Sequence, residues 1–123
     1  MARVAIVDDS RMARAFVRAT LEAAGHEVAE VIPTEVPAVV AALQAWRPDL
    51  VILDQAMPGC EGPSLVRACF EAEGLVEVPL LLLTAQRDPE LAVRMRKLGV
   101  QEVMHKPVSA SGLLAGVAAL IQS

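Results

Sequence analysis

Aromatic residues and cysteines are scarce in this sequence. Its 123 residues include one tryptophan, two phenylalanines and no tyrosine, although 54% of them are hydrophobic. A core therefore has to be built from aliphatic side chains, and the length is within the range of one compact domain. The two cysteines, Cys60 and Cys69, form neither a CxxC pair nor a disulfide framework, so we expect two reduced thiols.

An excess of positive charge and a long apolar run are also missing. The net charge of -4 leaves no basic stripe of the kind that binds nucleic acid, so we expect no direct contact with DNA. The apolar runs are too short to span a bilayer, and no basic leader precedes the first strand-like residues. We therefore expect a soluble, cytoplasmic protein without a signal peptide and without membrane contact.

The last stretch of the chain, residues 108–123, has no charged side chain. It predicts a helix whose core-facing residues are Leu113, Leu114, Val117, Leu120 and Ile121. The opposite face is small and weakly polar, with Gly112, Ala115, Gly116, Ala118, Ala119 and Gln122. Because exposed helix faces usually carry charge, we expect that this face docks onto another protein or a second copy, or that it is an alanine-rich surface without consequence.

Apolar runs of strand length alternate with amphipathic stretches of helical period throughout the chain. This alternation predicts βαβ units with right-handed crossovers, and hence one α/β domain with a parallel sheet. The predicted strands are 2–7, 27–32, 49–54, 79–84 and 101–105. Five helices are predicted to follow them, from Ser10 to Gly25, from Thr34 to Pro48, from Pro63 onward, from Asp88 to Gly99 and from Ser111 to Ile121.

Two details of the predicted helices depend on local pattern alone. In the first helix we expect Met12, Ala13, Phe16, Val17 and Leu21 to form the stripe that faces the core. Hydroxyl side chains are favoured at helix N-caps, which predicts that Ser10 caps the first helix and that Thr34 caps the second.

Polar side chains occur where the predicted strands end. Asp8 and Asp9 follow the first strand, and Asp54 closes the third. Thr84 ends the fourth strand, and Lys106 follows the fifth. The carboxyl ends of parallel strands share one edge of a sheet, where open α/β proteins bind their ligands. Three carboxylates and an ammonium group gathered there suit a divalent cation and a phosphoryl group.

Taken singly, each of these residues is more often a cap, a turn residue or a solvated charge. In combination, the motifs resemble the receiver domains of bacterial two-component response regulators. The matching segments are IVDDS at 6–10, DLVILDQAMPGCEG at 49–62, LLTA at 82–85 and GVQEVMHKP at 99–107.

The resemblance covers nearly the whole chain. It implies a single receiver domain over residues 1–123, similar to chemotaxis regulators and without an effector domain in this chain. It also implies a doubly wound α/β fold, with five helices around a five-stranded parallel sheet in the flavodoxin-like order 2-1-3-4-5.

The resemblance further implies a role for each acid. Asp54 would be the phosphoacceptor, receiving its phosphoryl group from a histidine kinase, a phosphotransfer protein or a small acyl phosphate. Asp9 would bind Mg²⁺ or Mn²⁺ directly, and Asp8 would reach the ion through water. Asp54 and the backbone carbonyl of Ala56 would complete the protein's share of the ligands.

By the same resemblance, the Thr84 hydroxyl and the Lys106 ammonium would contact the phosphate, and the bond from Lys106 to Pro107 is expected to be cis. At Val103, receivers commonly carry Tyr or Phe, so an aromatic switch cannot operate here. Ala56 and Gln86 occupy positions thought to tune the lifetime of the phosphate; Ala56 cannot position a water, whereas Gln86 could.

The predicted function is a phosphorylation-controlled signalling module whose fourth and fifth helices contact a protein target or a second copy. Its chemistry would be directed at itself, so we expect no enzyme in the ordinary sense. One alternative is a receiver-like scaffold that has lost phosphorylation. A small phosphatase with an aspartyl-phosphate intermediate is less favoured, because Ala56 stands where a second acid is needed. Scarce aromatics disfavour a flavin-binding module.

Overall fold

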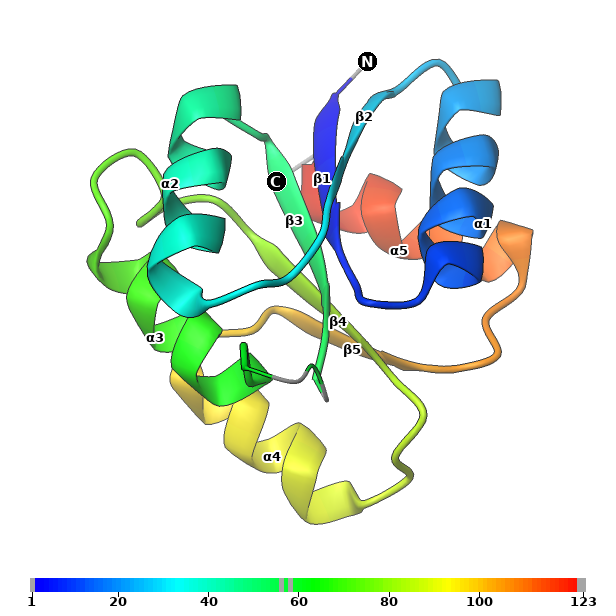
Figure 1. Cartoon of the computed structure of the whole chain (residues 1–123). Helices are drawn as coiled ribbons and strands as arrows, with labels where there is room; N and C mark the ends of the chain where they lie inside the picture. The colour runs from blue at the N-terminus through cyan, green and yellow to red at the C-terminus, as the bar shows by residue number, and fades with distance from the viewer. Residues whose placement is uncertain (1, 56, 58, 122–123) are drawn as a thin grey trace.

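The computed structural model of the chain describes residues 2–55, 57 and 59–121. Across them, strands and helices alternate in the predicted order (Figure 1). The strands are β1 (Arg3–Val7), β2 (Glu27–Val31), β3 (Leu50–Asp54), β4 (Leu80–Thr84) and β5 (Glu102–His105). The helices are α1 (Arg11–Ala23), α2 (Val36–Trp46), α3 (Gly62–Glu71), α4 (Pro89–Leu98) and α5 (Ala110–Ile121).

All strand pairs in the sheet are parallel, and the strand order is β2-β1-β3-β4-β5. The predicted α/β fold and its strand order are therefore confirmed. In the register, Val7 lies opposite Leu53, and Thr84 lies opposite His105. The residues that end or follow β1, β3, β4 and β5 consequently meet along one edge, which we call the carboxyl edge.

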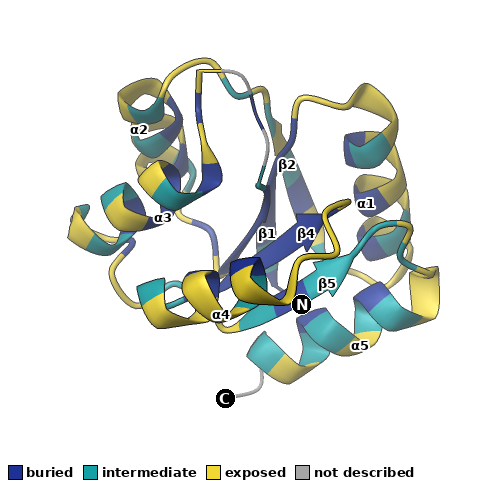
Figure 2. Ribbon diagram, turned by 90° about the horizontal axis from the view of Figure 1, so that it is seen from below, coloured by how far each residue is buried: buried dark blue, intermediate teal, exposed yellow. Residues whose placement is uncertain are grey.

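Helices cover both faces of the sheet. Figure 1 shows α1 and α5 on one side and α2, α3 and α4 on the other. Each side has its own aliphatic cluster, because successive strand residues point to opposite faces: Val4 and Ile6 of β1 belong to one cluster, and Ala5 and Val7 belong to the other. In Figure 2 the buried strands lie between helices whose outer surfaces are exposed. The central strands β3 and β4 are buried along their whole length, as expected for strands covered on both faces.

The inward face of α1 differs from the predicted one. Met12 is 83% exposed and Phe16 is 40% exposed, whereas the buried residues are Arg14, Val17 and Leu21. The expectation for Met12 and Phe16 was wrong because hydrophobicity alone placed them inside. The buried stripe is narrower and includes a charged residue, because the side chain of Arg14 has hydrogen-bond partners beneath the helix.

The helix starts agree with the prediction in one case and differ in another. Ser10 caps α1, with its side chain accepting a hydrogen bond from the backbone N–H of Ala13 at 3.1 Å. The predicted cap at Thr34 is wrong, because α2 begins one residue later, with Glu35 at the N-cap and no hydrogen bond from its side chain. Pro37 lies in the first turn of α2, where its missing N–H leaves no partner unsatisfied.

On α5, Ala115 and Ala119 are exposed as predicted, but Gly112 and Gly116 are half-buried. Leu113 and Val117 are buried, as expected. A Cβ atom added to Gly116 would lie 3.0 Å from the sulfur of Met104, and one added to Gly112 would lie 3.8 Å from the Cε atom of the same side chain. Gly116 therefore leaves room for Met104 of β5, Gly112 is in ordinary contact with the same side chain, and both glycines are half-buried.

Both cysteines are buried free thiols, as predicted. Burial raises the pKa of Cys60, and burial together with the neighbouring Cys60 raises the pKa of Cys69 to about 11. Both side chains are thus protonated at neutral pH. Within the part of the chain that the structure describes, no helix combines the length and the apolar character needed to cross a membrane.

Candidate functional site

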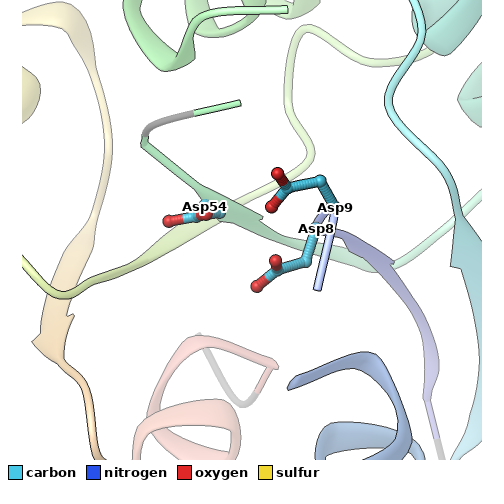
Figure 3. Close-up of side chains that lie close together, drawn as sticks. All are labelled: Asp8, Asp9 and Asp54. Atoms are coloured by element: carbon cyan, nitrogen blue, oxygen red, sulfur yellow. The ribbon is translucent and has the colours of Figure 1, made fainter. Parts of the chain in front are cut away.

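Three carboxylates converge at the carboxyl edge of the sheet. Asp8, Asp9 and Asp54 each contribute an oxygen, and these oxygens all lie within 4.8 Å of one another. Figure 3 shows the three side chains together, two from the end of β1 and one from the end of β3. They meet because β1 and β3 are neighbours, paired in parallel up to Val7 and Leu53. Carboxylates held this close repel one another unless cations compensate their charge.

The ammonium group of Lys106 provides a positive charge that compensates part of this repulsion. Its Nζ atom lies 2.9 Å from Oδ2 of Asp8 and 3.8 Å from Oδ2 of Asp54. The backbone N–H of Lys106 donates to the carbonyl of Thr84 at 2.8 Å, which holds the lysine at the carboxyl edge. The peptide bond to Pro107 is cis, as predicted. The sequence prediction that Lys106 faces the acids is therefore confirmed.

The turn between β1 and α1 holds Asp8 in place. Asp8 is fully buried, and its Oδ1 atom accepts a hydrogen bond from the backbone N–H of Ser10 at 2.9 Å. Its backbone carbonyl accepts a second one, at 2.6 Å, from Nη1 of Arg14. Asp9, in contrast, is exposed, so water and ions can reach its carboxylate.

Sequence reasoning missed Arg14. A signal for it was present, because Arg14 shares its helical face with Val17 and Leu21 at the spacing of three and seven residues. A charged residue on a core-facing stripe requires a buried partner. The pattern alone does not identify that partner, which here lies at the end of a neighbouring strand.

The remaining predicted site residues are also placed. Thr84 is buried at the carboxyl edge, next to Leu83, which pairs with Asp54 across β3 and β4. Its Oγ1 atom accepts a hydrogen bond from the backbone N–H of Gln86 at 3.0 Å, and Gln86 itself is exposed. Val103 is buried in the aliphatic cluster on the side of α2, α3 and α4. Ala56, the predicted carbonyl ligand, lies outside the described residues.

An apolar hollow of about 560 Å³ adjoins the site beside Lys106. It lies between the start of α1 and the segment that follows β5. Its lining includes Met12, Phe16, Val17, Ala85 and Pro107. Met12 and Phe16, which were expected in the core, therefore line a surface hollow beside Lys106.

The donor set suits a hard divalent cation. The three grouped side chains offer only carboxylate oxygens, the ligands that Mg²⁺ and Mn²⁺ prefer, and neither histidine nor cysteine belongs to the group found among the described residues. Mg²⁺ usually retains several waters and takes only a few protein ligands. The exposed Asp9 and the buried Asp8 and Asp54 thus fit such an ion.

Comparison with known proteins finds relatives that match nearly the whole chain. The family model described as "Response regulator receiver domain" matches residues 4–118. The phosphate regulon transcriptional regulatory protein PhoB of Pseudomonas aeruginosa is 30% identical over 119 residues, covering 97% of this chain and 51% of that protein. The sensor histidine kinase TmoS of Ectopseudomonas mendocina is 35% identical over 119 residues, covering 97% of this chain and 12% of that protein. The chain thus spans about half the length of the first relative and less of the second.

Solved structures show the same likeness in three dimensions. The chemotaxis response regulator CheY4 of Vibrio cholerae superposes with a TM-score of 0.88 at 31% identity, covering 98% of both chains. A signal receiver domain of a histidine kinase from Syntrophus aciditrophicus superposes with a TM-score of 0.86 at 30% identity, covering 99% of this chain and 91% of that one.

Proposed function

The chain belongs to the response regulator receiver domain family, and on this premise we propose that it is the phosphoacceptor module of a two-component phosphorelay. The observation that carries the proposal is the convergence of Asp8, Asp9 and Asp54 around one point, with Lys106 across the gap. Asp54 is the proposed phosphoacceptor, because it stands at the end of a central strand between the acids of β1 and the lysine after β5.

In the proposed reaction, a carboxylate oxygen of Asp54 forms a bond to the phosphorus of a phosphoryl donor. The bond from phosphorus to the donor's histidine nitrogen or acyl oxygen breaks, and its electron pair stays with that donor atom. Lys106 then exchanges its contact with Asp8 for a phosphate oxygen, to which an ammonium group donates well. The Thr84 hydroxyl accepts from Gln86 and keeps its own hydrogen to donate to the phosphate.

A divalent cation, Mg²⁺ or Mn²⁺, neutralises the charge of the phosphoryl oxygens when it is bound. Asp9 and Asp54 are the proposed direct ligands, because Asp9 is exposed and Asp54 carries the reacting oxygen. Asp8 is buried and already bonded to Ser10 and Lys106, so we assign it a contact through water. The carbonyl of Ala56 is the further ligand implied by the family.

The phosphoryl donor is proposed to be a histidine kinase or a phosphotransfer protein, in the cytoplasm. A sensor histidine kinase and a transcriptional regulator are among the relatives, so the same kind of domain occurs in both settings. A protein donor has to cover the surface around Asp54. The exposed Met12 and Phe16, beside the hollow at Lys106, give such a partner apolar area to bury.

The output is proposed to pass through α4, β5 and α5 to a protein target or a second copy. The exposed residues of α5 include Ala115 and Ala119, which permit close approach. Gly112 and Gly116 contribute less than the sequence indicates, because Met104 packs against them. Sedimentation with and without a phosphate mimic tests self-association, and a monomer under both conditions removes the second copy.

The switch is proposed to work without an aromatic ring. Val103 is buried in the same aliphatic cluster as Leu91 and Met95 of α4, and a valine has no ring that moves between the surface and the interior. A scaffold that is not phosphorylated is the alternative that this residue favours. The complete set of acids with Lys106 supports phosphorylation instead. Because the chemistry acts on the protein's own Asp54, we propose that the chain is not an enzyme in the ordinary sense.

The test is intact-mass analysis after incubation with acetyl phosphate or phosphoramidate, with Mg²⁺ and with a chelator. We expect one added phosphoryl group on the wild type in Mg²⁺ and none with the chelator. Asp54→Asn should gain none. Asp49→Asn is the matched control, because Asp49 lies at the opposite end of β3 and should be phosphorylated normally. No adduct on the wild type, or an adduct that persists in Asp54→Asn, overturns the proposal.

A further inference from the structure

We infer that Arg14 is a positioning residue for the cation site, because its guanidinium fixes the backbone that carries Asp8 and Asp9. The inference rests on the proposed function, since it concerns the affinity of the same site for Mg²⁺. It assigns a role to a buried charge that the proposed phosphoryl transfer does not itself use.

Arg14 is buried to an extent that is rare for arginine. It is 8% exposed, and arginine is seldom this buried unless it is paired. Its Nη1 atom donates to the backbone carbonyl of Asp8 at 2.6 Å, and its Nε atom donates to Oε1 of Glu30 at 3.1 Å. The planar guanidinium can serve both acceptors at once, which a lysine ammonium at the end of a flexible chain does less well.

The acceptor just after β1 is the carbonyl of the peptide group that joins Asp8 to Asp9. Because a peptide group is planar, holding this oxygen orients the plane from which both residues extend. The side chain of Asp8 is tied separately, by the backbone of Ser10 and by Lys106. The exposed side chain of Asp9 has no such tie to the described residues 2–55, 57 and 59–121, so its orientation depends on the backbone that Arg14 holds.

Glu30 anchors the other side of the guanidinium. It lies in β2, opposite Ile6 of β1, so it belongs to the strand next to the acids. Its carboxylate also accepts from Nη1 of Arg18 at 3.2 Å, one turn further along α1. Arg14 and Arg18 therefore share one carboxylate, but only Arg14 also reaches the backbone of Asp8.

Positioning and simple charge have opposite effects on cation binding. The guanidinium is a positive charge beside a site for a positive ion, so removing its charge alone would strengthen the binding of Mg²⁺. Removing a group that orients the ligands weakens the binding of Mg²⁺. For residues that hold a ligand without touching the metal, the loss is typically tenfold or more. The sign of the change separates the two roles.

The experiment is calorimetric titration of Mg²⁺ into the whole chain, with thermal unfolding measured in the absence of metal. We expect Arg14→Met to weaken Mg²⁺ binding about tenfold or more. Arg14→Lys keeps the positive charge but loses the planar guanidinium that donates to both Asp8 and Glu30, so it is expected to weaken Mg²⁺ binding as well. Arg18→Met is the matched control: it loses the same partner, Glu30, and should lower the melting temperature without changing the Kd.

Unchanged or tighter Mg²⁺ binding in Arg14→Met overturns the inference. If that variant does not fold, the same result in Arg14→Lys overturns it. Equal weakening in Arg18→Met overturns it too, because the effect would then belong to the ion pairs of Glu30 in general. If the wild type binds no Mg²⁺, the proposed metal site itself is contradicted. If the Arg14 variants bind Mg²⁺ as tightly as the wild type does, only the role of Arg14 is contradicted.

Discussion

Charged side chains are arranged differently at the two ends of the strands. At the amino edge, where the strands begin, Arg3 and Glu27 form an ion pair and Asp49 accepts a backbone hydrogen bond. The guanidinium of Arg3 lies 2.9 Å from Glu27 and 4.2 Å from the centre of the Trp46 ring. The backbone N–H of Arg3 donates to the carboxylate of Asp49 at 2.8 Å. These contacts join β1 to the start of β2 and to the segment before β3, and they serve the fold.

At the carboxyl edge, charge is left unbalanced. The carboxylates of Asp8, Asp9 and Asp54 crowd within 4.8 Å of one another, and the ammonium of Lys106 contacts two of them. A protein that needed only stability would not gather acids in this way, because their mutual repulsion opposes folding. The difference between the edges teaches that matched charges position the strands, whereas unmatched charges mark the functional site.

The largest expected effect is stabilisation by Mg²⁺ at the carboxyl edge. An ion that binds only the folded chain raises its free energy of unfolding by about 1.4 kcal/mol at ten times the Kd. Asp9→Asn removes an exposed ligand and should abolish this gain. The measurement is thermal unfolding over a series of Mg²⁺ concentrations. Equal shifts in the wild type and in Asp9→Asn would show that the ion binds elsewhere.

A charge removed from the amino edge should destabilise the fold and leave the site intact. Arg3→Met loses the ion pair with Glu27 and the contact with Trp46, at a cost of about 1 kcal/mol in the free energy of unfolding. Urea unfolding measures this cost, and calorimetry should give the wild-type Kd for Mg²⁺. A large change in Mg²⁺ affinity would mean that the two edges are not independent.

A charge removed from the carboxyl edge should have the opposite effect on stability. Without metal, Asp9→Asn relieves repulsion with the two neighbouring acids and should raise the free energy of unfolding by roughly 0.5 kcal/mol. The comparison is made by urea unfolding in a chelator. A loss of stability in Asp9→Asn would indicate that the acids are already balanced in the metal-free protein.

The smallest effect concerns Glu30, which lies between the two arginines of α1. Its pKa is lowered, chiefly by the hydrogen bond from Arg18 and further by Arg14. A lowered pKa contributes stability above the ordinary value of 4.5, and this contribution is lost as the pH falls through the folded-state pKa. Glu30→Gln should therefore cost about 0.3 kcal/mol at pH 7, and progressively less as the pH falls below 4.5. A cost that does not change with pH would assign the effect to packing.

The strands and the acids at their ends could be predicted because short stretches of sequence are enough to identify them. β3 and β4 are continuous apolar runs, as strands covered on both faces require, and Asp54 and Thr84 fall at their last positions. Parallel order then brings the strand ends to one edge, whatever the details of packing. For these residues, the strand limits and the βαβ alternation were sufficient.

The orientation of α1 and the packing of α5 depend on contacts that no local pattern contains. Arg14 is buried because Glu30 and the carbonyl of Asp8 lie beneath it, and this turns Phe16 outward. The glycines of α5 read as an outer surface in the sequence, because a stripe of small residues is the same whether it receives Met104 or a partner protein. In both cases the missing information is tertiary.

If the acids at the ends of β1 and β3 share one cation, titration of Mg²⁺ into the ¹⁵N-labelled protein should perturb the backbone amides at the carboxyl edge, which NMR follows residue by residue. We expect saturable shifts at Asp9, Gln55 and Lys106, and no shifts at Arg3 and Asp49 on the amino edge. The shifts should be lost in the Asp54→Asn variant. Shifts of similar size at both edges, or shifts that never saturate, would contradict a shared cation.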